Sequence, residues 1–140
     1  MPEVHINVRA GNGTGVRGGQ SFPGEVPLIR IRAGRESSET DLLNKDWVMV
    51  HEMIHLAFPW MDLNHNWMAE GLAVYVESIA RVQAGHLAPA QIWGDYVKMM
   101  PRGLPRSGDG GFEITKSHGR TYWGGAMFCL LADIEIRKRT

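Results

Sequence analysis

Cysteine is nearly absent from this sequence, and the one residue present, Cys129, lies in the apolar run AMFCLLA. A single cysteine excludes an internal disulfide bond, so the fold cannot depend on one. We expect Cys129 to be a buried, inert thiol rather than a nucleophile, because free cysteine is among the residue types most often buried.

Net charge is also absent, because 15 basic and 15 acidic residues balance in the 140-residue chain. No long-range field therefore favours nucleic acid or an anionic membrane surface as a partner. The sequence has no apolar run long enough to span a bilayer and no N-terminal pattern of a signal peptide. We predict a soluble protein of unknown compartment. An extracytoplasmic location would require a signal elsewhere in the parent chain.

The order of the predicted elements indicates an α+β fold, with short N-terminal strands followed by helices. VHINVRA (4–10) and EVPLIRIRA (25–33) have the composition of strands, and Pro27 places the second at a sheet edge or a strand start. The glycine-rich segment 11–24 is predicted to be a loop or an irregular edge segment. The remaining predictions are helices at 42–58, 67–84 and 89–100, a short strand in FEITK (112–116), and a last helix towards the C-terminus.

The length of the chain suits one domain with one core. The last apolar helix reaches Thr140 with no glycine or proline stop signal. We therefore expect a single domain, residues 1–140, that is a piece of a longer protein whose remainder could hold additional domains.

Two histidines and a glutamate form the pattern HEMIH at residues 51–55. Residues four apart lie on one face of a helix, so His51 and His55 can offer two imidazole nitrogens to one ion. H-E-x-x-H is a zinc-binding arrangement in which the glutamate, here Glu52, acts as general base. The alternative is an ordinary helix whose histidines are satisfied locally.

A third ligand is needed, because a catalytic zinc has three protein ligands and a fourth position for water. Glu70 in WMAEG is the best candidate, and Gly71 beside it allows a close backbone approach. The alternatives are that Glu70 only complements the dipole at a helix start, or that His65 is the ligand. Glu77 lies two turns along the same helix face, where it either hydrogen-bonds a ligating histidine or is solvated.

The sequence resembles the gluzincin zinc metallopeptidases, the clan of thermolysin and of the aminopeptidase N and glycyl aminopeptidase families. HEMIH resembles their zinc helix, WMAEGLAVYVE the segment that supplies the glutamate ligand, and TYWGGAMFCLLADIEIR their tyrosine-bearing stretch. The resemblance implies a small thermolysin-like (zincin) domain, a bound Zn²⁺, a peptide or protein substrate, and stabilisation of the oxyanion by Tyr122. Without the resemblance, Tyr122 is a core or helix-cap tyrosine.

The sequence departs from the aminopeptidase N pattern in two places. Only 14 residues lie between His55 and Glu70, where aminopeptidase N has about 18. The Gly-Ala-Met-Glu-Asn segment, which binds a free amino group in aminopeptidase N, is missing, so the glycyl aminopeptidase branch is the closer match. In this clan an edge strand beside the zinc helix binds the substrate backbone, and VPLIRIRA (26–33) is the candidate here.

The sequence therefore predicts a zinc-dependent peptidase. His51, His55 and Glu70 bind the metal, Glu52 activates water, and Tyr122 stabilises the oxyanion. The alternative is a non-catalytic zinc-bound scaffold or binding domain derived from such an enzyme, and a third reading is a zinc hydrolase of small non-peptide amides or epoxides.

Four further polar residues lie close to the tyrosine-bearing stretch in the sequence. Arg102, Arg106 and Arg120 are scattered and expected to be solvated, although one of them could hold a substrate carboxylate. His118 near Tyr122 either assists at the transition state or is a loop histidine.

Overall fold

The computed structural model describes residues 3–43 and 45–140 and contains two compact units, residues 1–59 and 60–140. Each unit is described by itself. The first contains β1 (His5–Gly11), β2 (Val16–Phe22), β3 (Leu28–Gly34), α1 (Glu39–Leu43) and α2 (Trp47–Ala57). The second contains η1 (Leu63–His65), α3 (Asn66–Gln83), α4 (Pro89–Met99), η2 (Met100–Gly103), η3 (Gly119–Gly124) and α5 (Gly125–Arg137).

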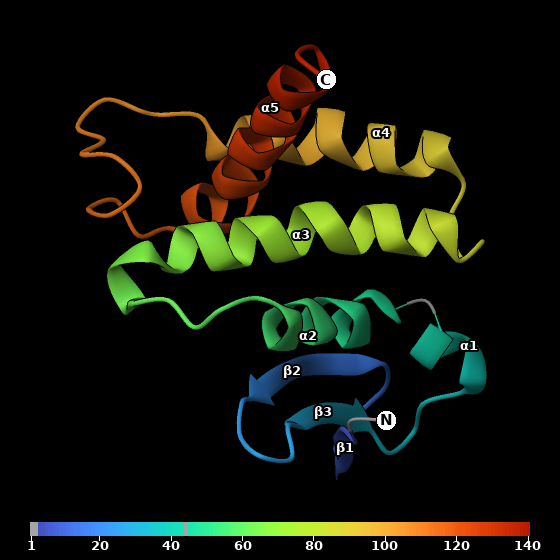
Figure 1. The fold of residues 1–140 in the computed structure, drawn as a ribbon. Helices are drawn as coiled ribbons and strands as arrows, with labels where there is room; N and C mark the ends of the chain where they lie inside the picture. The colour runs from blue at the N-terminus through green and yellow to red at the C-terminus, as the bar shows by residue number, and fades with distance from the viewer. Residues whose placement is uncertain (1–2, 44) are drawn as a thin grey trace. The chain divides into compact units, whose positions relative to one another are not determined.

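The sheet of the first unit has the strand order β1-β3-β2, with β3 parallel to β1 and antiparallel to β2 (Figure 1). The prediction that VPLIRIRA is an edge strand for substrate is therefore wrong, because β3 is paired on both sides. Pro27 directly precedes β3, as expected for a strand start, where its missing N–H removes no ladder hydrogen bond.

The glycine-rich segment 11–24 forms the edge strand β2, with a register shift between Val16 and Gly18. This confirms the prediction of an irregular edge segment. Gly18 has a φ of +146°, which side-chain-bearing residues rarely adopt, so glycine is required at the irregularity. A glycine-rich sequence alone does not favour a strand. Here the backbone hydrogen bonds to β3 hold the segment in an extended conformation.

Helix α2 packs on one face of this sheet, along β2 and β3 (Figure 1). Ile29 and Ile31 of β3 are buried together with Val48 of α2, because alternate residues of a strand point to the same face. Burying each isoleucine stabilises the fold by about 1.5–3 kcal/mol relative to leaving it exposed. These contacts fix α2, and with it HEMIH, on the sheet.

The longest helix of the second unit is α3, and α5 packs on it at a steep angle (Figure 1). Gly71 lies against the backbone of Gly125, where a Cβ atom would come within 2.3 Å of the carbonyl carbon. The expected close approach beside Glu70 is therefore confirmed. α3 ends at Gln83, next to the predicted end at residue 84, and Gly85 follows with a φ of +78°. The buried hydrophobic core joins α3, α4, η2 and α5 through Val74, Tyr75, Ile92, Tyr96, Met100 and Ala126.

The short strand predicted for FEITK is wrong, because this segment curls into a turn. The amide groups of Ile114 and Thr115 both donate to the carbonyl oxygen of Gly111, and Gly111 has a φ of +95°. The coarse α+β prediction, strands first and helices after, is confirmed. Within the described residues, no helix is long and apolar enough to cross a membrane.

Candidate metal centre and catalytic residues

Helix α2 brings His51 and His55 together on one face, as the spacing predicts. Their Nε2 atoms are 3.1 Å apart, and the two rings meet edge to face with centroids 4.8 Å apart. His51 is only 5% exposed, whereas His55 is half-buried. The helix ends after this pair, because Phe58 turns to an extended conformation before Pro59.

The separation of the two Nε2 atoms fits a shared zinc ion. Two imidazole nitrogens bound to one tetrahedral zinc at 2.0–2.1 Å lie about 3.3 Å from each other, close to the observed 3.1 Å. The same separation also fits an N–H···N hydrogen bond between two neutral rings. The donor set is the one that zinc prefers, and the two readings differ in whether metal is bound.

Glu52 is buried beside His51 and packs against the edge strand β2. A Cβ atom at Gly19 would lie 2.6 Å from the Glu52 Cγ and 2.9 Å from its Oε1. No hydrogen bond or ion pair of the described residues involves the Glu52 carboxylate. Its position is therefore set by packing against a glycine of β2, a contact that the motif alone does not indicate.

Glu70 and Glu77 belong to the second unit, on helix α3. Glu70 lies in the first half of α3, is half-buried and directly precedes the tightly packed Gly71. Glu77 is 7% exposed, accepts a hydrogen bond from the Ser78 hydroxyl at 3.2 Å and lies 3.7 Å from an Arg81 nitrogen. The alternative that Glu77 is a solvated helix glutamate is therefore wrong.

His65, the rival third ligand, lies in the short turn η1 and is exposed. Its Nδ1 is 2.9 Å from a carboxylate oxygen of Glu113. This partner comes from the loop before η3 and is a local explanation for the histidine. The contact favours the prediction that His65 is a turn residue.

Tyr122 lies in η3, a π-helical segment that continues directly into α5. Its ring is half-buried and stacks on His118, with centroids 4.5 Å apart and planes 14° apart. π-helical turns inside helices occur frequently at functional sites. His118 is thus packed on the candidate catalytic ring, although no pattern in the sequence indicates the π-helical turn.

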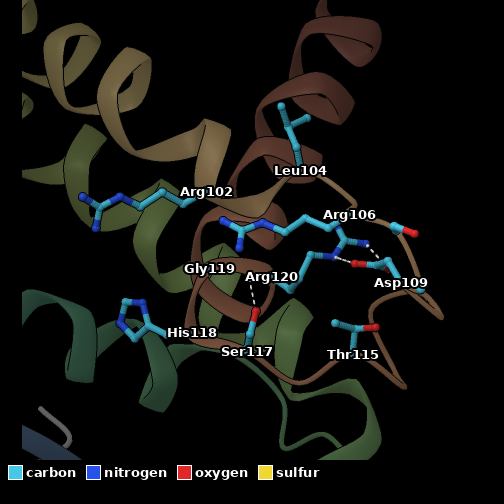
Figure 2. Close-up of a pocket in the computed structure, with 11 residues that line it drawn as sticks. Arg102, Leu104, Arg106, Asp109, Thr115, Ser117, His118, Gly119 and Arg120 are labelled. Atoms are coloured by element: carbon cyan, nitrogen blue, oxygen red, sulfur yellow. Dashed lines mark hydrogen bonds and ion pairs between the residues drawn. The ribbon is translucent and has the colours of Figure 1, made fainter.

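The arginines expected to be scattered line one pocket of about 630 Å³ in the second unit (Figure 2). Arg102, Arg106 and Arg120 share it with His118, so the prediction that they are scattered is wrong. Their gathering follows from close backbone packing, since a Cβ atom at Gly119 would come within 2.3 Å of the carbonyl oxygen of Arg102.

Arg120 is buried and fixed, which corrects the expectation that it is solvated. Its Nε lies 2.9 Å from one oxygen of Asp109, its Nη2 lies 3.4 Å from the other, and Nη1 donates to the carbonyl oxygen of Gly103. The guanidinium also lies over the Phe112 ring, 4.1 Å from its centroid. Arg120 therefore holds the pocket wall together.

Cys129 lies in α5 and is half-buried. Burial raises the pKa of its thiol, so little thiolate forms at neutral pH. This agrees with the expected inert thiol.

No family model, curated protein or solved structure matches this chain. The comparisons therefore add nothing to the site.

Proposed function

We propose that this chain is a zinc-dependent metallopeptidase domain of the gluzincin type, with His51, His55 and Glu70 as the metal ligands. The observation that carries the proposal is the 3.1 Å separation of the two histidine Nε2 atoms, with Glu52 next to them on the same helix. Neutral imidazole and carboxylate are ligands that zinc prefers. Glu70 enters from the motif order in the sequence, and its half-buried position on α3 is compatible with a ligand.

A zinc ion at these residues would polarise water and the carbonyl group of a scissile peptide bond. Glu52 accepts the proton of the attacking water and passes it to the leaving nitrogen. The buried environment of Glu52 keeps its carboxylate in one place for both transfers. The Tyr122 phenol donates a hydrogen bond to the carbonyl oxygen as negative charge develops there.

Glu77 has the role of a positioning residue in this proposal, holding a ligating histidine by a hydrogen bond. Glu77 is buried and is held on α3 by the Ser78 hydroxyl and by Arg81, so a histidine would share a carboxylate that is already fixed in position. The His118 ring, stacked on Tyr122, orients the phenol.

The test begins with zinc content per chain, measured by mass spectrometry on wild type, His55→Ala and the control His86→Ala, whose histidine lies beyond α3. We expect about one zinc in wild type and in the control, and little in His55→Ala. Absence of zinc from wild type after expression in zinc-supplemented medium would contradict the proposed metal site. HEMIH would then be an ordinary helix with two neighbouring histidines.

The second step is a peptide library, with cleavage followed by mass spectrometry for wild type and Glu52→Gln. Wild type should cleave peptides, and Glu52→Gln should retain zinc while losing cleavage. Cleavage by a zinc-loaded Glu52→Gln variant would contradict the proposed base. Zinc binding without cleavage of any peptide by wild type would identify the alternative, a non-catalytic zinc-bound scaffold.

A further inference from the structure

We infer that the arginine-lined pocket of the second unit binds a carboxylate group. Given the proposed peptidase function, on which this assignment of substrate class rests, it selects peptides with an acidic side chain or a free C-terminal carboxylate. The pocket lies where η2, the loop after it and the start of η3 meet, and it holds about 630 Å³ (Figure 2).

The charge of the lining is the first argument. Three arginines and one aspartate line the pocket, which leaves two positive charges in excess. Asp109 is engaged by both Nε and Nη2 of Arg120 and so does not neutralise the other two arginines. Among residues 3–43 and 45–140, no hydrogen bond or ion pair occupies the guanidinium of Arg102 or Arg106.

The direction of these side chains is the second argument. Figure 2 shows the guanidinium groups of Arg102 and Arg106 extending towards the side of the pocket on which His118 lies. A planar guanidinium with several donors matches a carboxylate better than any other side chain does. Each of the two can therefore hold a carboxylate at this pocket.

Hydrogen-bond donors in the pocket wall are the third argument. The Thr115 hydroxyl oxygen accepts from the Gly110 amide at 2.9 Å, and the Ser117 hydroxyl oxygen accepts from the Arg120 amide at 3.2 Å. Since both oxygens already act as acceptors, their O–H groups are left to donate to an anion.

The link to substrate comes from His118, which lines the pocket and stacks on Tyr122 with ring centroids 4.5 Å apart. The His118 ring therefore lies between this pocket and the proposed oxyanion donor. That spacing suits a side chain or chain end near the scissile bond of the same peptide.

The test is direct binding, followed by ¹H–¹⁵N NMR of the zinc-loaded wild-type chain. One probe pair is N-acetyl-glutamate N-methylamide with its glutamine analogue, and the other is N-acetyl-glycine with N-acetyl-glycinamide. Each pair differs only by carboxylate against amide, and the two arms separate a side-chain carboxylate from a chain-end carboxylate. We expect the carboxylate probe of at least one pair to bind about tenfold tighter and to shift amides within residues 102–120.

The variant Arg102→Gln/Arg106→Gln should lose this preference, whereas Arg139→Gln, which lies beyond the end of α5 and does not line the pocket, should keep it. Arg102 and Arg106 are both exposed, so their replacement should not disturb the fold. The amide signals of residues outside the pocket should stay unchanged. Equal binding of acid and amide, a preference that survives the double variant, or binding of inorganic phosphate alone would overturn the inference. Because the readout is binding, a failure of peptide cleavage and a failure of this site are seen separately.

Discussion

The side chain of Glu52 lies on the backbone of Gly19, in the space that any larger residue at position 19 would fill. The proposed catalytic base is therefore positioned by an edge strand that lies far from it in the sequence. Val48, one turn earlier on α2, would lie 2.9 Å from the same Cβ atom, so α2 packs closely on β2 at this point.

Gly19→Ala should move the Glu52 carboxylate while leaving both histidines in place. We expect kcat for peptide cleavage to fall by about 10²-fold, because misplacing a catalytic group by about 1 Å has effects of this size. Zinc content should stay at the wild-type value. The matched control is Gly24→Ala, whose added methyl group meets only ordinary contacts at 3.8 Å. Equal kcat values for the two alanine variants would show that Glu52 is not positioned by β2.

Tyr122→Phe should lower kcat by about 10²–10³-fold, since it removes one hydrogen-bond donor to the oxyanion. KM and zinc content should change little, because the ring and its stacking on His118 are retained. Tyr96→Phe removes a hydroxyl from the core of the same unit and is the control for loss of stability alone. A wild-type kcat for Tyr122→Phe would contradict the proposed oxyanion donor and would leave Tyr122 with a structural role only.

Asp109→Asn should destabilise the second unit by about 3 kcal/mol, because it leaves the charge of Arg120 buried without its partner. The two side chains are only 9% and 7% exposed. Glu135→Gln breaks an ion pair to Lys138 that is more than half exposed and should cost less than about 1 kcal/mol. Urea unfolding of the three proteins measures both effects, and similar losses for the two variants would contradict the structural role of Arg120.

Alkaline pH should weaken the second unit through its buried tyrosines. Burial raises the pKa of Tyr96 to about 12, above the ordinary value of 10.0. A group whose pKa is raised on folding stabilises the fold fully below its unfolded pKa and loses that contribution as pH rises through its folded pKa. Stability in urea should therefore decrease between about pH 10 and 12, and less steeply in Tyr96→Phe. At neutral pH, Tyr96→Phe should lower the free energy of unfolding by about 1 kcal/mol, because it removes the hydroxyl group that donates to the carbonyl oxygen of Tyr75.

Local patterns in the sequence predict the helices and the histidine pair. The i,i+4 spacing of His51 and His55 places both rings on one face of α2, where their side-chain rotamers bring the Nε2 atoms to 3.1 Å. The ends of α2 and α3 likewise follow from Pro59 and Gly85. These features depend only on residues within a few positions of one another.

Features that depend on distant segments escaped prediction. The central place of β3 follows from its pairing with two other strands, and no pattern within VPLIRIRA specifies a second partner. Arg120 appears solvated in the sequence because Asp109 lies eleven residues away and meets it only through the folded loop. The pocket likewise requires the close packing of Gly119 on Arg102, which involves backbone rather than any recognisable side-chain motif.

The strand order β1-β3-β2 also has a consequence for how the first unit assembles. β2 and β3 are joined by a short connection and pair antiparallel, whereas β1 must close a longer loop around β2 before it can pair with β3. Pairings that close longer loops form later and detach more readily. Helix α2 packs on β2 and β3, while the residues of β1 are all exposed. Fraying of β1 should therefore leave the two histidines of α2 in place, since β2 and β3, on which α2 packs, can stay paired without β1.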